Sequence, residues 1–167
     1  MQVARRGRTR WQFGALALAL SIGTLQAAPE LQVTLEGQIQ VVADGEVSWA
    51  ALADGAQVKP GELIRYQVEL ANTGDAEAKR PSALGRIPAG TLFVLESATS
   101  EPDMAVEYSI DGGDTFSGQP TIVVEDEHGR KRTVPAPASL YTTIRWTWNA
   151  PIPSGDSASV FYQVQVR

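Results

Sequence analysis

The sequence predicts an all-β protein, an antiparallel β-sandwich of about eight to ten strands. Short segments in which apolar and polar residues alternate recur along the chain, as they do in half-buried strands. Glycine and proline punctuate these segments, and after residue 27 no stretch offers a sustained helical stripe. With 167 residues and 43% apolar content, the chain is long enough for one hydrophobic core.

Residues 1–27 are predicted to form a secretory signal peptide. Four arginines without any acidic residue form a basic head, and residues 13–22 form an apolar core. This core is shorter than the roughly 20 residues that span a bilayer, so we expect cleavage after Ala27 and no transmembrane helix after processing. An arginine-rich transit peptide and twin-arginine export are weaker alternatives. The protein is therefore expected to be periplasmic, cell-surface or secreted.

Composition narrows the choice of partner. Removing the signal peptide leaves ten basic and 19 acidic residues, a net charge of −9. A chain this acidic repels phosphate backbones and anionic lipids, which argues against nucleic acid or a membrane surface as partner. The absence of cysteine excludes disulfides and thiolate metal sites, so stability must come from packing.

Residues 28–54 are predicted to form N-terminal strands that pack on the sandwich or extend it. Residues 31–36 and 38–42 alternate cleanly on either side of Gly37, and together they can form one long bent strand. Asp44-Gly45 signals a tight turn, after which residues 46–52 return as the partner strand. This segment is therefore expected to be a hairpin.

The strand around which the chain is organised runs from Gly61 to Asn72. Its alternation places four apolar side chains on one face, those of Ile64, Tyr66, Val68 and Leu70. A turn is predicted over residues 72–75, and Pro81 restricts any strand before Gly90 to a sheet edge. Residues 91–95 form a short apolar run that predicts a buried strand.

The C-terminal half continues this pattern. Residues 106–110 alternate, and residues 121–125 and 130–134 flank a polar tip as a hairpin. The last two strands, within residues 141–148 and 157–166, each place large apolar side chains on one face: Ile144, Trp146 and Trp148 in the first, and Val160, Tyr162, Val164 and Val166 in the second.

Three blocks of residues carry a family resemblance. They are Gly61-x-x-Ile64-x-Tyr66-x-Val68-x-Leu70-x-Asn72-x-Gly74, then Ile87-Pro88-x-Gly90-x-x-Phe93-Val94, then Gly155-x-Ser157-x-x-Val160-x-Tyr162-x-Val164-x-Val166. Together they resemble the bacterial and archaeal conserved repeat domain catalogued as domain of unknown function number eleven, over about residues 55–167. The resemblance implies an immunoglobulin-like sandwich in a surface or secreted protein, without established catalytic residues. Gly85 stands where that family usually has an aspartate.

A second motif is carried by five residues: Ser109, Asp111, Gly113, Thr115 and Phe116. Their spacing resembles an Asp-box, a hairpin motif of sialidases, other glycosidases and secreted β proteins. The resemblance implies a structural turn whose aspartate accepts hydrogen bonds from amides of its own turn. A calcium site at Asp111 and Asp114 is the alternative, but calcium takes six to eight oxygen ligands and too few are identifiable here.

Two further groups of residues are candidates for chemistry. Glu125-Asp126-Glu127-His128 has metal-ligating side chains, but neighbouring residues at a strand end point in different directions, which favours a solvated loop. Trp49, Trp146 and Trp148, with Tyr141, are a candidate aromatic platform for sugars, although core packing accounts for tryptophans on an inner sandwich face.

The sequence thus predicts an exported, non-catalytic module with a structural or protein-interaction role in the cell envelope. No cofactor is expected, and another envelope protein is the expected partner. A carbohydrate- or calcium-binding module of a secreted system is the alternative. An enzyme ranks third, because the only histidine, His128, has no recognisable nucleophile and orienting group beside it.

Overall fold

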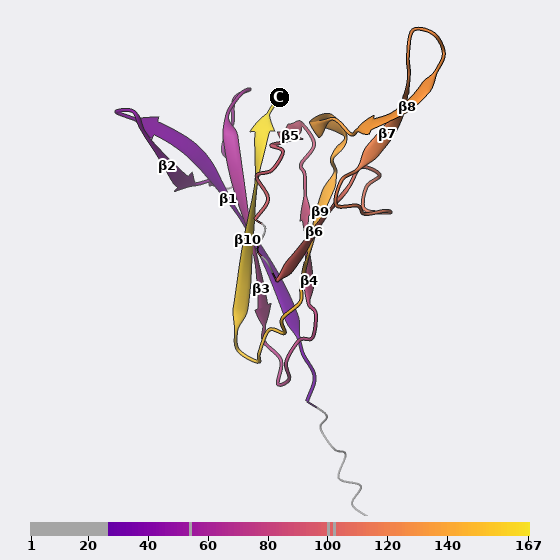
Figure 1. Ribbon diagram of the computed structural model, residues 1–167. Coiled ribbons are helices and arrows are strands. Elements are labelled where there is room, and N and C mark those ends of the chain that lie inside the picture. Colours follow the sequence, from indigo (N-terminus) through magenta and orange to yellow (C-terminus); the bar gives the residue numbers. More distant parts are fainter. Residues whose placement is uncertain (1–26, 54, 100, 102) are drawn as a thin grey trace, which may run out of the picture.

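The computed structural model describes residues 27–53, 55–99, 101 and 103–167, which form an antiparallel, immunoglobulin-like β-sandwich (Figure 1). The larger sheet has the order β2-β1-β3-β10-β5, with bounds Glu46–Ala51, Leu31–Ala43, Leu63–Asn72, Ser157–Val166 and Thr91–Phe93. The smaller sheet has the order β4-β9-β6, with bounds Ser82–Arg86, Thr143–Trp148 and Met104–Ser109. The predicted all-β sandwich is confirmed.

Two further elements complete the fold. Strands β7 (Thr121–Glu125) and β8 (Lys131–Pro135) form a separate hairpin that projects from the sandwich (Figure 1), and the short 3-10 helix η1 (Ala138–Leu140) follows it. None of the helices in the described ranges has the length and apolar character needed to cross a membrane. The predicted signal peptide lies outside the described residues, apart from Ala27.

Strand β3 lies at the centre of the larger sheet. It pairs with β1 on one side and with β10 on the other, both antiparallel. The side chains of Ile64, Val68 and Leu70 are at most 3% exposed, and Tyr66 stacks on Tyr162 of β10 with ring centroids 5.3 Å apart. The predicted N-terminal hairpin also forms, because β1 runs through Gly37 as one strand and β2 pairs with its second half.

The core lies between β3 and β10 of the larger sheet and β9 of the smaller one. Its two largest side chains, Trp146 and Tyr162, are fully buried, yet each has a polar group that finds a partner. Trp146 Nε1 donates to the carbonyl of Thr99 at 3.1 Å, and the Tyr162 hydroxyl donates to the carbonyl of Arg86 at 2.5 Å. Both bonds satisfy donors that would otherwise be buried without a partner.

Gly85 on the edge strand β4 has a steric reason to be glycine. A Cβ atom at this position would lie 2.8 Å from the Trp146 ring and 2.9 Å from the Tyr162 ring. Real Cβ contacts are not this short, so any larger residue would push the two aromatic rings out of the core. An aspartate, which the predicted family resemblance would place here, would not fit.

Asn72 closes the end of the sandwich where β3 finishes. It is 1% exposed, and its amide donates to the carbonyls of Ala76 and Ile152 at 2.8 and 3.0 Å. Its carbonyl oxygen accepts from the N–H groups of Glu30 and Gly74 at 3.3 and 3.2 Å. The turn predicted here is present, but Asn72 also joins the entry to β1 to the loop before β10.

One predicted strand is shorter than expected. The apolar run over residues 91–95 predicts a buried strand, but β5 ends at Phe93 and Leu95 is 49% exposed. The reason is a turn in which the N–H of Ser97 donates to the carbonyl of Val94 at 3.2 Å. Glu96 occupies this turn with a φ of 64°, a left-handed conformation that ends the extended chain.

Candidate functional site

An exposed apolar strip lies on the first half of β1 and is formed by Leu31, Val33 and Leu35. These side chains are 42%, 54% and 55% exposed. They sit opposite Asn72, Leu70 and Val68 of β3 in the antiparallel register, so they point to the same side of the sheet as the core. We call these three residues the β1 strip.

The β1 strip is exposed because the smaller sheet is narrower than the larger one. The larger sheet has five strands and the smaller only three, and β1 lies one strand beyond β3. Figure 1 shows β2 and the second half of β1 spreading away from the smaller sheet, while the first half of β1 lies beside β3. An inward-pointing side chain on the first half of β1 is therefore exposed to solvent. An inward-pointing side chain on β3 instead packs in the core with Trp146 and its neighbours.

The backbone beside the β1 strip is also open. The Glu30 carbonyl accepts from the N–H of Thr73 at 2.8 Å, and the Gly37 carbonyl accepts from Leu52 beyond the other edge at 2.9 Å. Backbone groups alternate sides along an antiparallel strand, so those of Leu31, Val33 and Leu35 point away from β3. Pairing with β2 starts only at Gln38, and within the described residues no strand covers this edge.

This edge lacks the features that protect sheet edges. Such edges usually carry lysine, proline or an inward-pointing charge, which discourage pairing with another chain. Residues 31–36 contain neither lysine nor proline, and their single charged residue, Glu36, sits opposite Gln67 on the outer face. The edge therefore combines free hydrogen-bonding groups with exposed apolar side chains, the two features that a protein partner recognises.

The tryptophans named from the sequence do not share a surface. Trp146 packs in the core with no exposure, and Trp148 is half-buried further along β9. Trp49 lies on β2 of the other sheet, where the Arg65 guanidinium stands 4.6 Å from its ring centroid. The candidate sugar platform is therefore not assembled from these three residues.

The Ser109 to Phe116 turn is closed by its own side chains. The Asp111 carboxylate accepts from the N–H and the hydroxyl of Thr115 at 2.9 and 2.5 Å, and from the Ser109 hydroxyl at 2.7 Å. The fully buried Ser109 Oγ also accepts from the N–H of Gly113 at 2.8 Å. Phe116 anchors the turn from outside, with its ring centroid 4.1 Å from the Arg145 guanidinium. The Asp111 carboxylate therefore bonds residues of its own turn, the N–H of Gly112 donates to Thr142 Oγ1 at 3.0 Å, and the identity of the turn as an Asp-box stays a prediction.

These hydrogen bonds also bear on the calcium alternative. Those from the Thr115 side chain, the Thr115 N–H and the Ser109 hydroxyl hold the pKa of Asp111 well below its usual range. Both carboxylate oxygens thus already accept hydrogen bonds from donors of the turn. Among the described residues, no group of three or more histidine, aspartate or glutamate side chains is placed to hold a metal ion. The arrangement of the described carboxylates lends the calcium site no support.

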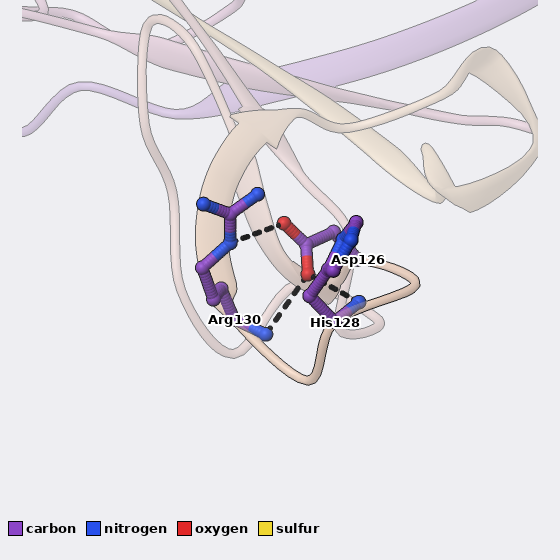
Figure 2. A network of polar contacts seen from close by, with 3 residues as sticks. All are labelled: Asp126, His128 and Arg130. Carbon is purple, nitrogen blue, oxygen red and sulfur yellow. Dashed lines mark hydrogen bonds and ion pairs between the residues drawn. The ribbon is translucent and has the colours of Figure 1, made fainter.

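The Glu125 to His128 segment is a second aspartate-closed turn, at the tip of the β7–β8 hairpin (Figure 2). Asp126 accepts from the N–H groups of His128 and Arg130 at 2.9 and 3.0 Å, and from Nε of Arg130 at 2.9 Å. The two backbone hydrogen bonds are the main cause of a lowered Asp126 pKa. The carboxylate orders the loop, and the imidazole of His128 takes no part in these bonds.

Comparisons with family models, with curated proteins and with solved structures find no match to this chain. The candidate site therefore rests on geometry alone. The β1 strip was not among the residues named from the sequence, although its alternation was read correctly as a strand. The sequence feature that could reveal this strip is its alternation, combined with a return strand, β2, that is too short to cover the first half of β1.

Proposed function

We propose that this protein is an exported, non-catalytic β-sandwich module that serves a structural or protein-interaction role in the cell envelope. The observation that carries the proposal is the β1 strip beside a free strand edge. An exposed apolar strip next to unpaired backbone groups is costly to leave in water and prone to aggregation. A partner that adds a strand at this edge removes both costs, with main-chain hydrogen bonds for affinity and side-chain contacts for specificity.

Two other observations are consistent with this role. The carboxylates of Asp111 and Asp126 both accept hydrogen bonds from residues of their own turns, which is the arrangement expected of structural turns. The resemblance to the conserved repeat domain family points to the same kind of module, and membership of that family stays a prediction. Another envelope protein is the proposed partner, since the charge of the processed chain disfavours nucleic acid and anionic lipid.

Site-specific photo-crosslinking in cells of the source organism tests the interaction surface. A photoreactive residue at Val33 is expected to capture a discrete protein, because this side chain lies at the free edge. The same residue at Val123 is a matched control, since Val123 is a strand valine that is 65% exposed but lies on the β7–β8 hairpin. Identical products at the two positions, or none at Val33, would contradict the proposal.

Export is tested separately by intact mass. The protein recovered from the envelope or the medium is expected to begin at Ala28, following cleavage after a small residue. A protein that retains Met1 and stays in the cytoplasm would remove the envelope part of the proposal, while the crosslinking result would still decide on the interaction surface.

A further inference from the structure

A pocket lies between residues of β5, β6 and the start of β7. Figure 1 shows where these strands lie in the sandwich. The pocket has a volume of about 390 Å³, within the range of small-ligand sites. Its walls come mainly from Phe93, Leu95, Glu96, Tyr108, Tyr141 and residues 118–121. In the larger sheet β3 and β10 separate β5 from β1, so this pocket and the β1 strip are distinct surfaces.

Three aromatic rings form the inner wall of this pocket. The ring centroids of Phe93, Tyr108 and Tyr141 lie 5.4 to 5.6 Å from one another. Phe93 is 2% exposed, whereas both tyrosines are half-buried. Neither tyrosine hydroxyl makes a hydrogen bond to another of the described protein groups, so both remain available to a ligand or to water.

The rim of the pocket is held in an unusual backbone conformation. Glu96 has a φ of 64°, which a residue with a side chain rarely adopts and which glycine would adopt without strain. The turn brings both Leu95 and Glu96 to the pocket, where each is exposed. Residues held in such a conformation cluster at ligand-binding and active sites.

The charge of the pocket indicates what it accepts. Among the described residues that line it, Glu96 is the one acidic residue, and none is a lysine, an arginine or a histidine. Its charge acts on the aromatic wall: burial, then the charges of Tyr141 and Glu96, raise the pKa of Tyr108. Aromatic faces attract cations, so the wall and the carboxylate favour the same kind of ligand.

We propose that this pocket binds a cationic group carried on an apolar stem, the chemistry of a lysine side chain or of a free alkylammonium ion. The stem packs against Leu95 and the aromatic rings, and the ammonium group lies between the aromatic faces and the Glu96 carboxylate. This function is additional to the proposed role of the β1 strip and does not depend on it.

NMR titration of the purified protein tests the proposal through the ring signals of Tyr108 and Tyr141. The first probe is N-acetyl-lysine methylamide, and its control is N-acetyl-norleucine methylamide, which has the same stem without the charge. The lysine probe is expected to shift both tyrosine signals and to bind about tenfold more tightly than the control, the scale of a partly desolvated cation–π contact with a carboxylate nearby.

Variants separate a binding role of Glu96 from a structural one. Glu96→Gln is expected to weaken lysine-probe binding about tenfold, while the matched change Glu127→Gln at the exposed hairpin tip leaves it unchanged. Glu96→Gly relieves the backbone strain, so it is expected to raise the melting temperature and yet lose binding. A residue with only a structural role would not show this opposition between stability and binding.

The source of the cation is decided by two more probes. Tighter binding of the peptide Gly-Gly-Lys-Gly-Gly than of n-butylammonium would identify a lysine of a protein partner, and equal binding would identify a small free cation. The proposal is overturned if the norleucine probe binds as well as the lysine probe, if a methyl glycoside shifts the tyrosine signals where the cations do not, or if no probe shifts them.

Discussion

Strands β1 and β10 lie on either side of β3, and their inward-facing side chains differ in exposure. Both pair antiparallel with β3, and both turn alternate apolar side chains towards the same side of the sheet. The inward residues of β10, Val160, Tyr162 and Val164, have no exposure, whereas those of the β1 strip are 42–55% exposed. Alternation therefore tells which side of a sheet a residue faces, but a second layer must lie over that side before the residue is buried.

The largest expected effect comes from placing the same charged residue on β10 and on β1. Val164→Asp on β10 places an unpaired charge in the core and is expected to destabilise the protein by about 3–5 kcal/mol. Val33→Asp on β1 meets water instead, so its cost should stay within about 1 kcal/mol. Urea denaturation of the two variants measures the difference. Equal losses would mean that the β1 strip is covered in the free protein.

A smaller effect concerns the hydroxyl that links β10 to the smaller sheet. Tyr162→Phe removes the hydrogen bond to the carbonyl of Arg86, so we expect a loss of about 0.5–1.5 kcal/mol. Tyr66→Phe is the matched control, because Tyr66 stacks on Tyr162 but its hydroxyl makes no hydrogen bond to another described group. Similar losses in both variants would show that the Tyr162 hydrogen bond adds no stability of its own.

Tyr162 is also expected to make the stability of the protein depend on pH in the alkaline range. Burial, and then the charge of Tyr66, raise the pKa of Tyr162 well above its usual value, so the folded protein favours the protonated hydroxyl. This contribution to stability is complete below about pH 10, where unfolded tyrosine begins to ionise, and it is lost as the pH rises further. The free energy of unfolding should therefore fall above about pH 10, and less steeply in Tyr162→Phe. Identical slopes would contradict this assignment.

The smallest expected effect is a difference in amide hydrogen exchange between neighbouring residues of β1. The N–H groups of Gln32 and Thr34 point to β3, while those of Val33 and Leu35 point to solvent. Amide hydrogen exchange followed by NMR should alternate along β1, with the solvent-facing groups exchanging up to about tenfold faster, the scale of one hydrogen bond. Uniform protection would indicate that another strand pairs with this edge.

Much of this fold is readable from short stretches of sequence. The bounds of β10 and the turn at Asp44-Gly45 follow from alternation and from residues that tolerate positive φ; the φ angles of Asp44 and Gly45 are 53° and 81°. The hydrogen-bonded turn at Asp111 is predictable for the same reason. Every partner of this carboxylate lies within four residues, so local geometry is sufficient.

Other features depend on contacts between residues far apart in the chain. Leu95 looks like a strand residue, but the turn at Glu96 places it beside a pocket whose walls come from five separate segments. The β1 strip has the same alternating pattern as the buried face of β10, and it is exposed because the smaller sheet does not reach over β1. Alternation and turn chemistry act over a few residues, whereas burial depends on how many strands the opposite layer holds, and no short stretch of this chain carries that information.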